Sequence, residues 1–319
     1  MPDLGVLRNE DPRDTWRDEA RDFTPWLAEH IATLGEVLGI EIELVQVEKD
    51  VGDFSIDILA RDLGRDRLVV IENQLEVTDH SHLGQILTYA AGVEAGSVAW
   101  VSREFRPEHR KAIDWLNRGF AGQVNFFGVV LEVLRIDNSR PAVNLRLVAA
   151  PNEWGRGPSN RGPGELSDRQ QAYIRFFQRL IDELREKHRF TNARVAQPMS
   201  WYSFGSGYSG LHFNVAFKSG RRMCTELYID VGDGDHNERI LVNLQKDKER
   251  VERELGESLS WEELATKRAC RIAAYREASI EDAQADLDEY HEWAVERLLA
   301  FKRVFGPLLG RAAAAAEGR

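Results

Sequence analysis

The chain has 319 residues, of which 43% are hydrophobic and 30% are charged, so it contains enough apolar material for two buried cores. A net charge of −11 and an isoelectric point near 5.3 exclude a surface that coats nucleic acid indiscriminately, although they leave room for a local basic groove. The cysteines, Cys224 and Cys270, show neither metal-ligand spacing nor a disulfide framework. Since we find no signal peptide and no apolar stretch of the roughly 20 residues that a membrane span needs, we expect a cytoplasmic protein with no membrane partner.

Two apolar runs in the first quarter of the chain predict a β-hairpin. Phe54 to Ala60 and Leu68 to Leu75 are both rich in β-branched and large apolar residues. The connector between them, Arg61 to Arg67, contains Asp, Gly and Asp, which are typical of a turn.

Polar residues at the end of the second run predict a metal site. Alternation along a strand places Glu72 and Gln74 on the same face. In the simplest hairpin register Asp57 lies beside Glu72, and the two carboxylates are hard oxygen ligands for one Mg²⁺ or Mn²⁺. The Gln74 amide is then placed to orient a metal-bound water for attack on a phosphodiester.

A helix is expected directly after this strand. Thr78 and Asp79 offer an N-cap for a helix that runs from Leu83 to Ala91. Gln85 and Tyr89 are four residues apart on this helix, so their side chains share a face.

The rest of the first half completes an α/β unit. Ser97 to Ser102 reads as a buried strand, Pro107 to Arg118 as a helix, and Asn125 to Arg135 as a further strand. This alternation predicts a mixed sheet flanked by helices.

A stretch dense in Pro, Gly and Asn, PNEWGRGPSNRGPG, predicts a linker over residues 151–165. It separates an N-terminal domain, 1–150, from a C-terminal α+β domain, 166–319. In the second domain we expect a long helix from Ser167, strands over 211–218 and 221–230, and helices over 236–255, 261–267 and 280–305.

The polar residues of the hairpin resemble the core motif of the PD-(D/E)xK nuclease superfamily. That motif is an acid on one strand followed by acid-x-lysine on the next. Asp57, Glu72 and Gln74 match it as an ExQ variant, with glutamine at the lysine position. The QILTY string, which holds Gln85 and Tyr89, is similar to the Q-x-x-x-Y motif of the RecB-like branch. The resemblance covers Arg17 to about Trp154.

This resemblance implies a restriction-endonuclease-like fold and a metal-dependent endonuclease that hydrolyses DNA with Mg²⁺ or Mn²⁺. It places Gln85 and Tyr89 near the active site and DNA. Members often add an acid from the first core helix, for which Glu29 is the candidate. It also implies a homodimer, because a subunit with one metal site cuts one strand.

Two further residues are candidates for binding substrate or supporting the site. His82 lies in the predicted helix, and Arg61 belongs to the basic connector RDLGRDR. A second basic cluster, REFRPEHRK, spans Arg103 to Lys111.

The whole chain also resembles a bacterial family in which the nuclease-like half is joined to a C-terminal domain of unknown function, with strings such as TELYID and ERELGESLSWEEL. We expect this domain to select the target or to mediate dimerisation, in defence against foreign DNA or in repair.

Other readings stay open. A single Asp or Glu on a strand usually has a structural role, so Asp57 and Glu72 could have one as well. A nuclease-fold protein that lost its lysine would be a catalytically inactive module that binds nucleic acid or a protein. The negative net charge is also compatible with a structural or regulatory protein that does not bind DNA.

Overall fold

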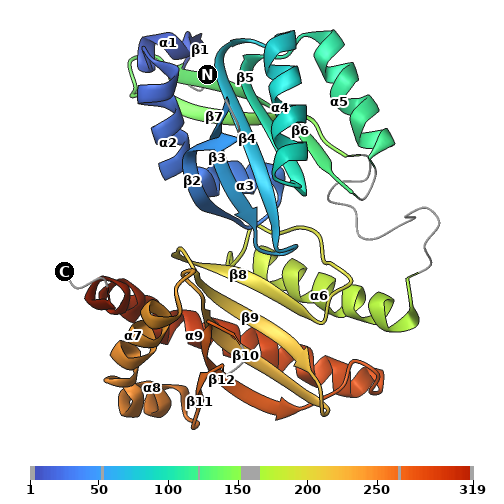
Figure 1. Cartoon of the computed structure of the whole chain (residues 1–319), viewed down its shortest axis with the longest axis vertical. Coiled ribbons are helices and arrows are strands. Elements are labelled where there is room, and N and C mark those ends of the chain that lie inside the picture. Colours follow the sequence, from blue (N-terminus) through green and yellow to red (C-terminus); the bar gives the residue numbers. More distant parts are fainter. Residues whose placement is uncertain (1–3, 52–53, 121–122, 152–165, 265–266, 317–319) are drawn as a thin grey trace. The chain divides into compact units, whose positions relative to one another are not determined.

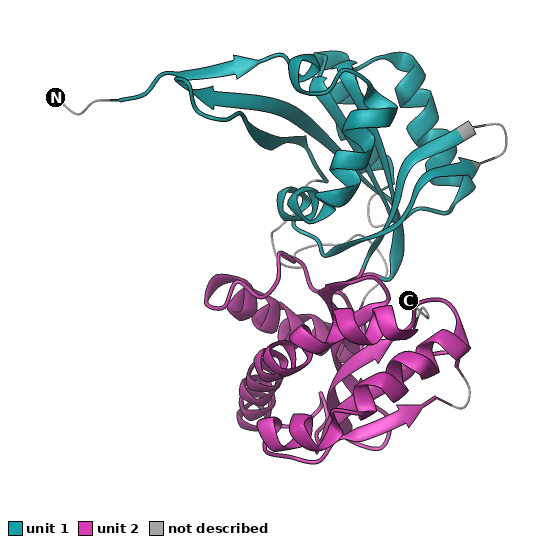
Figure 2. Ribbon diagram, turned by 90° about the vertical axis from the view of Figure 1, so that its left-hand side faces the viewer, with its two compact units in different colours: residues 1–62, 66–156 teal, residues 63–65, 157–319 magenta. Residues whose placement is uncertain are grey.

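The computed structural model describes residues 4–51, 54–120, 123–151, 166–264 and 267–316. They form two compact units, residues 1–62 with 66–156 and residues 63–65 with 157–319 (Figure 2). The predicted linker, apart from Pro151, lies outside the described residues.

The first unit is built around a seven-stranded mixed sheet with the order β1-β6-β5-β4-β3-β2, in which β7 also pairs with β6. Its central strands β4, β5 and β6 are parallel, whereas β2, β3 and β7 pair antiparallel to their neighbours. The strands are β1 (Leu7–Glu10), β2 (Ile42–Val51), β3 (Phe54–Asp62), β4 (Arg67–Val77), β5 (Ser97–Glu104), β6 (Asn125–Ile136) and β7 (Ala142–Ala149).

Helices cover both faces of this sheet (Figure 1). The parallel crossovers place α4 and α5 on one face, where Ile86 and Ile113 pack against Val70 and Trp100. On the other face Phe23, from the short segments at the start of the chain, packs with the sheet residues in a second core. The helical segments are α1 (Pro12–Thr15), η1 (Glu19–Phe23), α2 (Thr24–Glu29), α3 (Ile31–Leu38), α4 (His80–Gly92) and α5 (Pro107–Gly119).

The predicted fold class is therefore confirmed as a mixed sheet flanked by helices. The predicted hairpin is confirmed as β3 and β4, and α4 follows it with Asp79 as its N-cap. Strands β2 and β7 at the edges of the sheet were not predicted.

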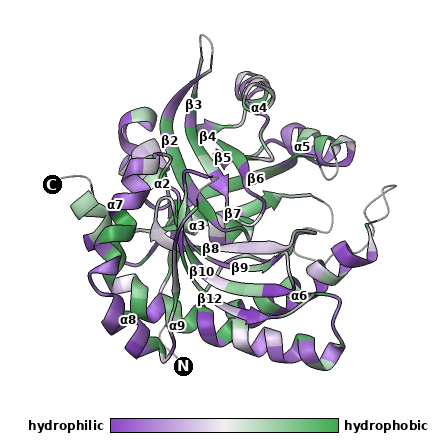
Figure 3. Cartoon of the chain, turned by 60° about the horizontal axis from the view of Figure 1, so that its bottom comes forward, coloured by the Kyte–Doolittle hydropathy of each residue, from purple (hydrophilic) through white to green (hydrophobic). Residues whose placement is uncertain are grey.

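The second unit holds a five-stranded antiparallel sheet in the order β11-β12-β10-β9-β8. Helices α6, α7, α8 and α9 contribute to one large core with this sheet. Figure 3 shows α8 as mainly hydrophilic, and its two apolar residues, Val251 and Leu255, are the ones that are buried, as expected for a helix with one face in a core. The elements are α6 (Asp168–Glu186), β8 (Trp201–Tyr208), β9 (Leu211–Lys218), β10 (Arg222–Ile229), α7 (Gly234–Gln245), α8 (Lys248–Leu255), β11 (Ser260–Glu263), β12 (Cys270–Glu277) and α9 (Gln284–Ala316).

The predicted single helix over 236–255 is two helices, α7 and α8, and strands β8 and β12 were not predicted. One further segment was assigned the wrong type. The segment from Trp261 was expected to be a helix, but Ser260–Glu263 is a strand that pairs with β12. The sequence WEEL has a good helix propensity, and pairing with a neighbouring strand overrides that local preference. Trp261 is also held by a hydrogen bond from its indole nitrogen to Glu252 Oε1, at 3.1 Å.

None of the described helices combines the length and the apolar character that a membrane crossing requires.

Candidate active site

Strands β3 and β4 separate where the polar residues begin. Their register runs from Asp62 opposite Arg67 to Ile58 opposite Ile71. Beyond that point, side-chain carboxylates take the place of a β3 backbone acceptor for two β4 amides. Asn73 donates its backbone N–H to Asp57 Oδ2 at 2.8 Å, and Leu75 donates to Glu19 Oε2 at 2.7 Å. The separation of the strands thus opens the space in which the acids gather.

Asp57 and Glu72 lie side by side at this separation. The backbone N–H of Asp57 donates to Glu72 Oε1 at 3.4 Å, and Glu72 is only 3% exposed. Asn73 fixes the Asp57 carboxylate further, because its side-chain amide also donates to Oδ2, at 3.0 Å. Thr24 in turn donates to Asn73 Oδ1 at 3.1 Å. Two donors therefore converge on Oδ2 of Asp57, which leaves Oδ1 better placed to accept a ligand.

Burial makes both carboxyl groups hard to ionise. For Asp57, burial raises the pKa to about 7; hydrogen bonding to Asn73 opposes this, and the negative charge of Glu19 adds to it. For Glu72, burial and then the charge of Asp57 raise the pKa to about 9. The pair is thus an acidic site without enough positive charge to compensate it.

A further acid near the carboxylate pair is Glu19, and the structure does not bring the predicted Glu29 to this pair. Glu19 and Glu48 both raise the pKa values of Asp57 and Glu72 through their charge. Glu29, at the end of α2, is exposed, and none of the interactions described for the carboxylate pair involves it. No local signal in the sequence marks Glu19, because its place beside β4 depends on how the start of the chain packs against the sheet.

Gln74 is occupied by structural contacts. Its amide nitrogen donates to Val77 O at 3.0 Å and to Asp79 Oδ2 at 3.3 Å, and its carbonyl oxygen accepts from Trp100 Nε1 at 2.8 Å. The residue is 1% exposed. Both N–H groups of the amide are therefore in use, and only the second acceptor site of Oε1 is left for the predicted orientation of a water.

Tyr89 lies within reach of the charges of the carboxylate pair, and Gln85 forms a hydrogen bond with Tyr89. Burial raises the pKa of Tyr89, the charges of Glu72 and then Asp57 raise it further, and a hydrogen bond from Gln85 opposes them. Tyr89 is 2% exposed. Gln85 Oε1 is buried and has no hydrogen-bond partner within the described part of the chain. A buried acceptor of this kind suits a water or ligand donor.

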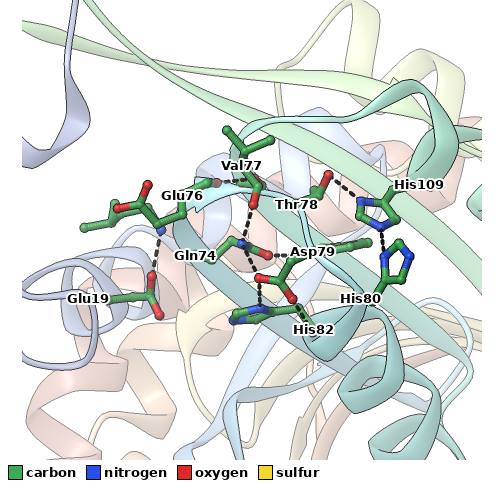
Figure 4. Close-up of polar contacts among 12 residues, drawn as sticks. Glu19, Gln74, Glu76, Val77, Thr78, Asp79, His80, His82 and His109 are labelled. Atoms are coloured by element: carbon green, nitrogen blue, oxygen red, sulfur yellow. Dashed lines mark hydrogen bonds and ion pairs between the residues drawn. The ribbon is translucent and has the colours of Figure 1, made fainter.

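The remaining two predicted residues differ in their placement. His82 bonds through Nδ1 to Asp79 Oδ2 at 2.8 Å, and its charge lowers the pKa of Asp57 (Figure 4). Arg61 instead pairs with Asp66 at 2.6 Å near the turn of the hairpin. The structure therefore brings His82 to the acids and ties Arg61 to the turn.

The donor set suits a hard divalent cation with few protein ligands. Among the described residues, no three His, Cys, Asp or Glu side chains are grouped as a ready metal cage. Mg²⁺ characteristically keeps several waters and takes only one or two carboxylates from the protein, together with substrate phosphate. Asp57 and Glu72 fit that pattern, and their buried negative charge is what such an ion would offset.

A family described as Domain of unknown function (DUF4268) matches residues 172–309. No curated protein matches the chain.

Two solved structures are similar to part of the chain. One is the "crystal structure of a repair endonuclease from Pyrococcus abyssi", with 15% identity, a TM-score of 0.28, and coverage of 34% of this chain and 45% of that one. The other is the "Structure of EndoMS-dsDNA2 complex", with 18% identity, a TM-score of 0.26, and coverage of 33% and 43%. The alignments therefore span less than half of either solved chain.

The raised pKa values predict a pH-dependent stability of the metal-free protein. A carboxyl group whose pKa is higher in the folded chain than in the unfolded chain stabilises the fold while it is protonated. This contribution is fully present below the unfolded pKa, near 4, and is lost as the pH rises through the folded pKa. The folded pKa is about 7 for Asp57 and about 9 for Glu72. We expect Glu72→Gln to gain at least about 1 kcal/mol of unfolding free energy over the wild type between pH 5 and pH 8 in EDTA. Urea denaturation over this range is the measurement, and parallel curves for the two proteins would contradict the assignment.

The contacts of Gln74 predict that lysine is a poor replacement. Gln74→Lys removes the acceptor of the buried Trp100 indole N–H, so we expect it to lower the unfolding free energy by about 1–3 kcal/mol. Trp100→Phe removes that donor, so the loss caused by lysine should be smaller in the Trp100→Phe background. A double-mutant cycle measures this coupling, and strict additivity would show that the indole bond does not select glutamine.

Proposed function

We propose that the chain is a metal-dependent endonuclease that hydrolyses phosphodiester bonds in DNA. The observation that carries the proposal is the pair of a buried Glu72 and a half-buried Asp57 at the separation of β3 and β4. Burying two carboxyl groups with mainly acidic neighbours is unfavourable for folding, which favours a role in binding a cation over a structural one.

Asp57 and Glu72 would hold the cation, with Asn73 and Thr24 keeping the Asp57 carboxylate in place. When bound, Mg²⁺ or Mn²⁺ lowers the pKa of a coordinated water and neutralises charge on the scissile phosphate. Tyr89 and the aliphatic residues around it close the helix side of the site. Gln85 offers its unpartnered oxygen toward a water or a substrate donor.

A basic and aromatic surface on α5 suits the DNA backbone. Lys111, Trp115 and Arg118 are spaced so that they share one face of the helix, and all three are exposed. Trp115 is 65% exposed, which is unusual for so large an apolar side chain. Cationic and aromatic side chains together bind phosphates and stack on bases. Helix α5 lies on the same face of the sheet as α4, and a hydrogen bond between His80 and His109 at 2.8 Å joins the two helices.

The engagement of Gln74 favours one alternative, an inactive module that binds nucleic acid or a protein. In that case the chain keeps the fold and the acids but lacks a group to activate water. One metal site per chain cuts one strand, so a double-strand break by this protein requires two chains, and the homodimer stays a prediction.

The first prediction of the proposal concerns cleavage. With Mg²⁺ or Mn²⁺ present, we expect the wild type to nick supercoiled plasmid, and Asp57→Asn and Glu72→Gln to lower the rate by 100-fold or more, because each removes a charged ligand. Glu29→Gln is the matched control, since Glu29 is exposed and should not affect the rate. Equal rates for the wild type and both carboxamide variants would exclude these acids as the active site.

The second prediction concerns DNA binding. We expect Lys111→Glu with Arg118→Glu to weaken DNA binding at least 10-fold at low salt and to reduce the slope of log affinity against log salt by about 2, because two phosphate contacts are lost.

The matched control for this variant is Arg8→Glu with Arg140→Glu, the same change of charge at two other exposed arginines of the first unit. Equal weakening by both pairs, measured by fluorescence anisotropy, would mean that only net charge matters and that α5 is not the interface.

A further inference from the structure

An aspartate and a histidine at the start of α4 form a dyad of the kind that prepares an imidazole to accept a proton. Asp79 Oδ1 caps the helix by accepting the backbone N–H of His82 at 2.9 Å, and its Oδ2 lies 2.8 Å from Nδ1 of the same histidine. A carboxylate at that distance keeps the proton on Nδ1, so the lone pair of the neutral ring is on Nε2. The side chain of His82 is 25% exposed, so part of the side chain reaches solvent.

A buried chain of hydrogen bonds holds Asp79 in place. Trp100 Nε1 donates to Gln74 Oε1 at 2.8 Å, and Gln74 Nε2 donates to Asp79 Oδ2 at 3.3 Å (Figure 4). Trp100 is fully buried and Gln74 is 1% exposed, so neither is free to turn. Although burial raises the pKa of Asp79, hydrogen bonds from His82 and Gln74 bring it below its ordinary value. The carboxylate is therefore charged when it orients the ring.

The dyad lies on the same side of the sheet as the carboxylate pair. His82, Ile86 and Tyr89 are spaced by four and three residues, so they share one face of α4. Ile86 and Tyr89 are buried against Leu59 and Val70, residues of the two strands that carry the acids. His82 continues this face toward the end of β4, and its charge acts on Asp57.

We infer that His82 is the general base of the proposed endonuclease, that Asp79 orients it, and that Gln74 is a positioning residue for Asp79. In the step assigned to His82, one O–H bond of the attacking water breaks and its proton moves to Nε2. The water oxygen uses that electron pair to form a new bond to phosphorus. The bond from phosphorus to the leaving sugar oxygen breaks, and this oxygen keeps the pair and takes a proton from solvent water. His82 then returns its proton to solvent.

This assignment rests on the proposed function and explains how the site would work with glutamine at the position of the superfamily's lysine. The neighbouring histidine does not share the geometry. His80 bonds through Nδ1 to His109 Nε2 at 2.8 Å, and His109 bonds through Nδ1 to Thr78 Oγ1 at 2.8 Å. His80 is therefore tied to α5 and serves as the matched control.

The test measures two quantities on the full chain, the single-turnover rate of plasmid nicking with Mg²⁺ and the Kd for an uncut fragment of the same plasmid without divalent ion. We expect His82→Gln to lower the rate on the order of 100-fold and to leave Kd within about twofold. Asp79→Asn keeps the helix cap but offers an N–H to Nδ1, so it should also slow cleavage at unchanged Kd. Free imidazole should raise the rate of His82→Ala and not that of Glu72→Gln.

The outcomes separate this inference from the proposed function. Loss of nicking in Glu72→Gln with full nicking in His82→Gln would overturn the role of His82 and leave the endonuclease intact. Equal losses of rate and DNA affinity in His82→Gln would show that it contacts phosphate and is not the base. A slow His80→Gln would show that the loss does not belong to the dyad. A wild type that cuts nothing while binding DNA would overturn both the function and the inference.

Discussion

The site depends on one constraint, which is that two adjacent carboxyl groups are withdrawn from water, Glu72 fully and Asp57 in part. Carboxylates inside a protein are costly unless hydrogen bonds or positive charge compensate them. Here two backbone hydrogen bonds supply the compensation. The backbone N–H of Asn73 on β4 donates to the Asp57 carboxylate, and the backbone N–H of Asp57 donates to Glu72. These bonds can form because the pairing of β3 with β4 ends at Ile58 and Ile71 and does not include Asp57 or Glu72. The surroundings still raise the pKa values of both carboxyl groups, and a bound cation would lower them.

The same strand explains why glutamine stands where a lysine is usual in the superfamily that the sequence resembles. The side chain at position 74 must both accept a hydrogen bond, from the Trp100 indole, and donate, to Val77 O and Asp79. An amide does both, whereas an ammonium group only donates. Because Gln74 is used in this way, we assign the acceptance of the water proton to His82, which lies two hydrogen bonds further along the same chain, beyond Asp79.

The sequence predicted the parts of the site that depend on local patterns. Two runs of β-branched and large apolar residues, joined by turn residues, indicated the hairpin, and its simplest register brought Asp57 beside Glu72. A cap at Asp79 indicated α4. It did not predict Glu19, whose contact with Leu75 joins segments 56 residues apart. Alternation gave the face of Gln74 but not its partners, because Trp100 comes from the next strand of the sheet. In the second unit, local helix propensity misled at β11, where pairing with β12 decides the structure.

Calorimetry with Mn²⁺ measures directly whether the carboxylate pair binds a divalent cation, and it depends neither on turnover nor on a DNA sequence. We expect the wild type to bind one Mn²⁺ in this site, more tightly at pH 8 than at pH 6, and to release protons as it binds, because the carboxyl groups must ionise to serve as ligands. Glu72→Gln should lose that binding. If the wild type binds no more Mn²⁺ than Glu72→Gln and releases no protons at any pH in this range, Asp57 and Glu72 do not form a cation site.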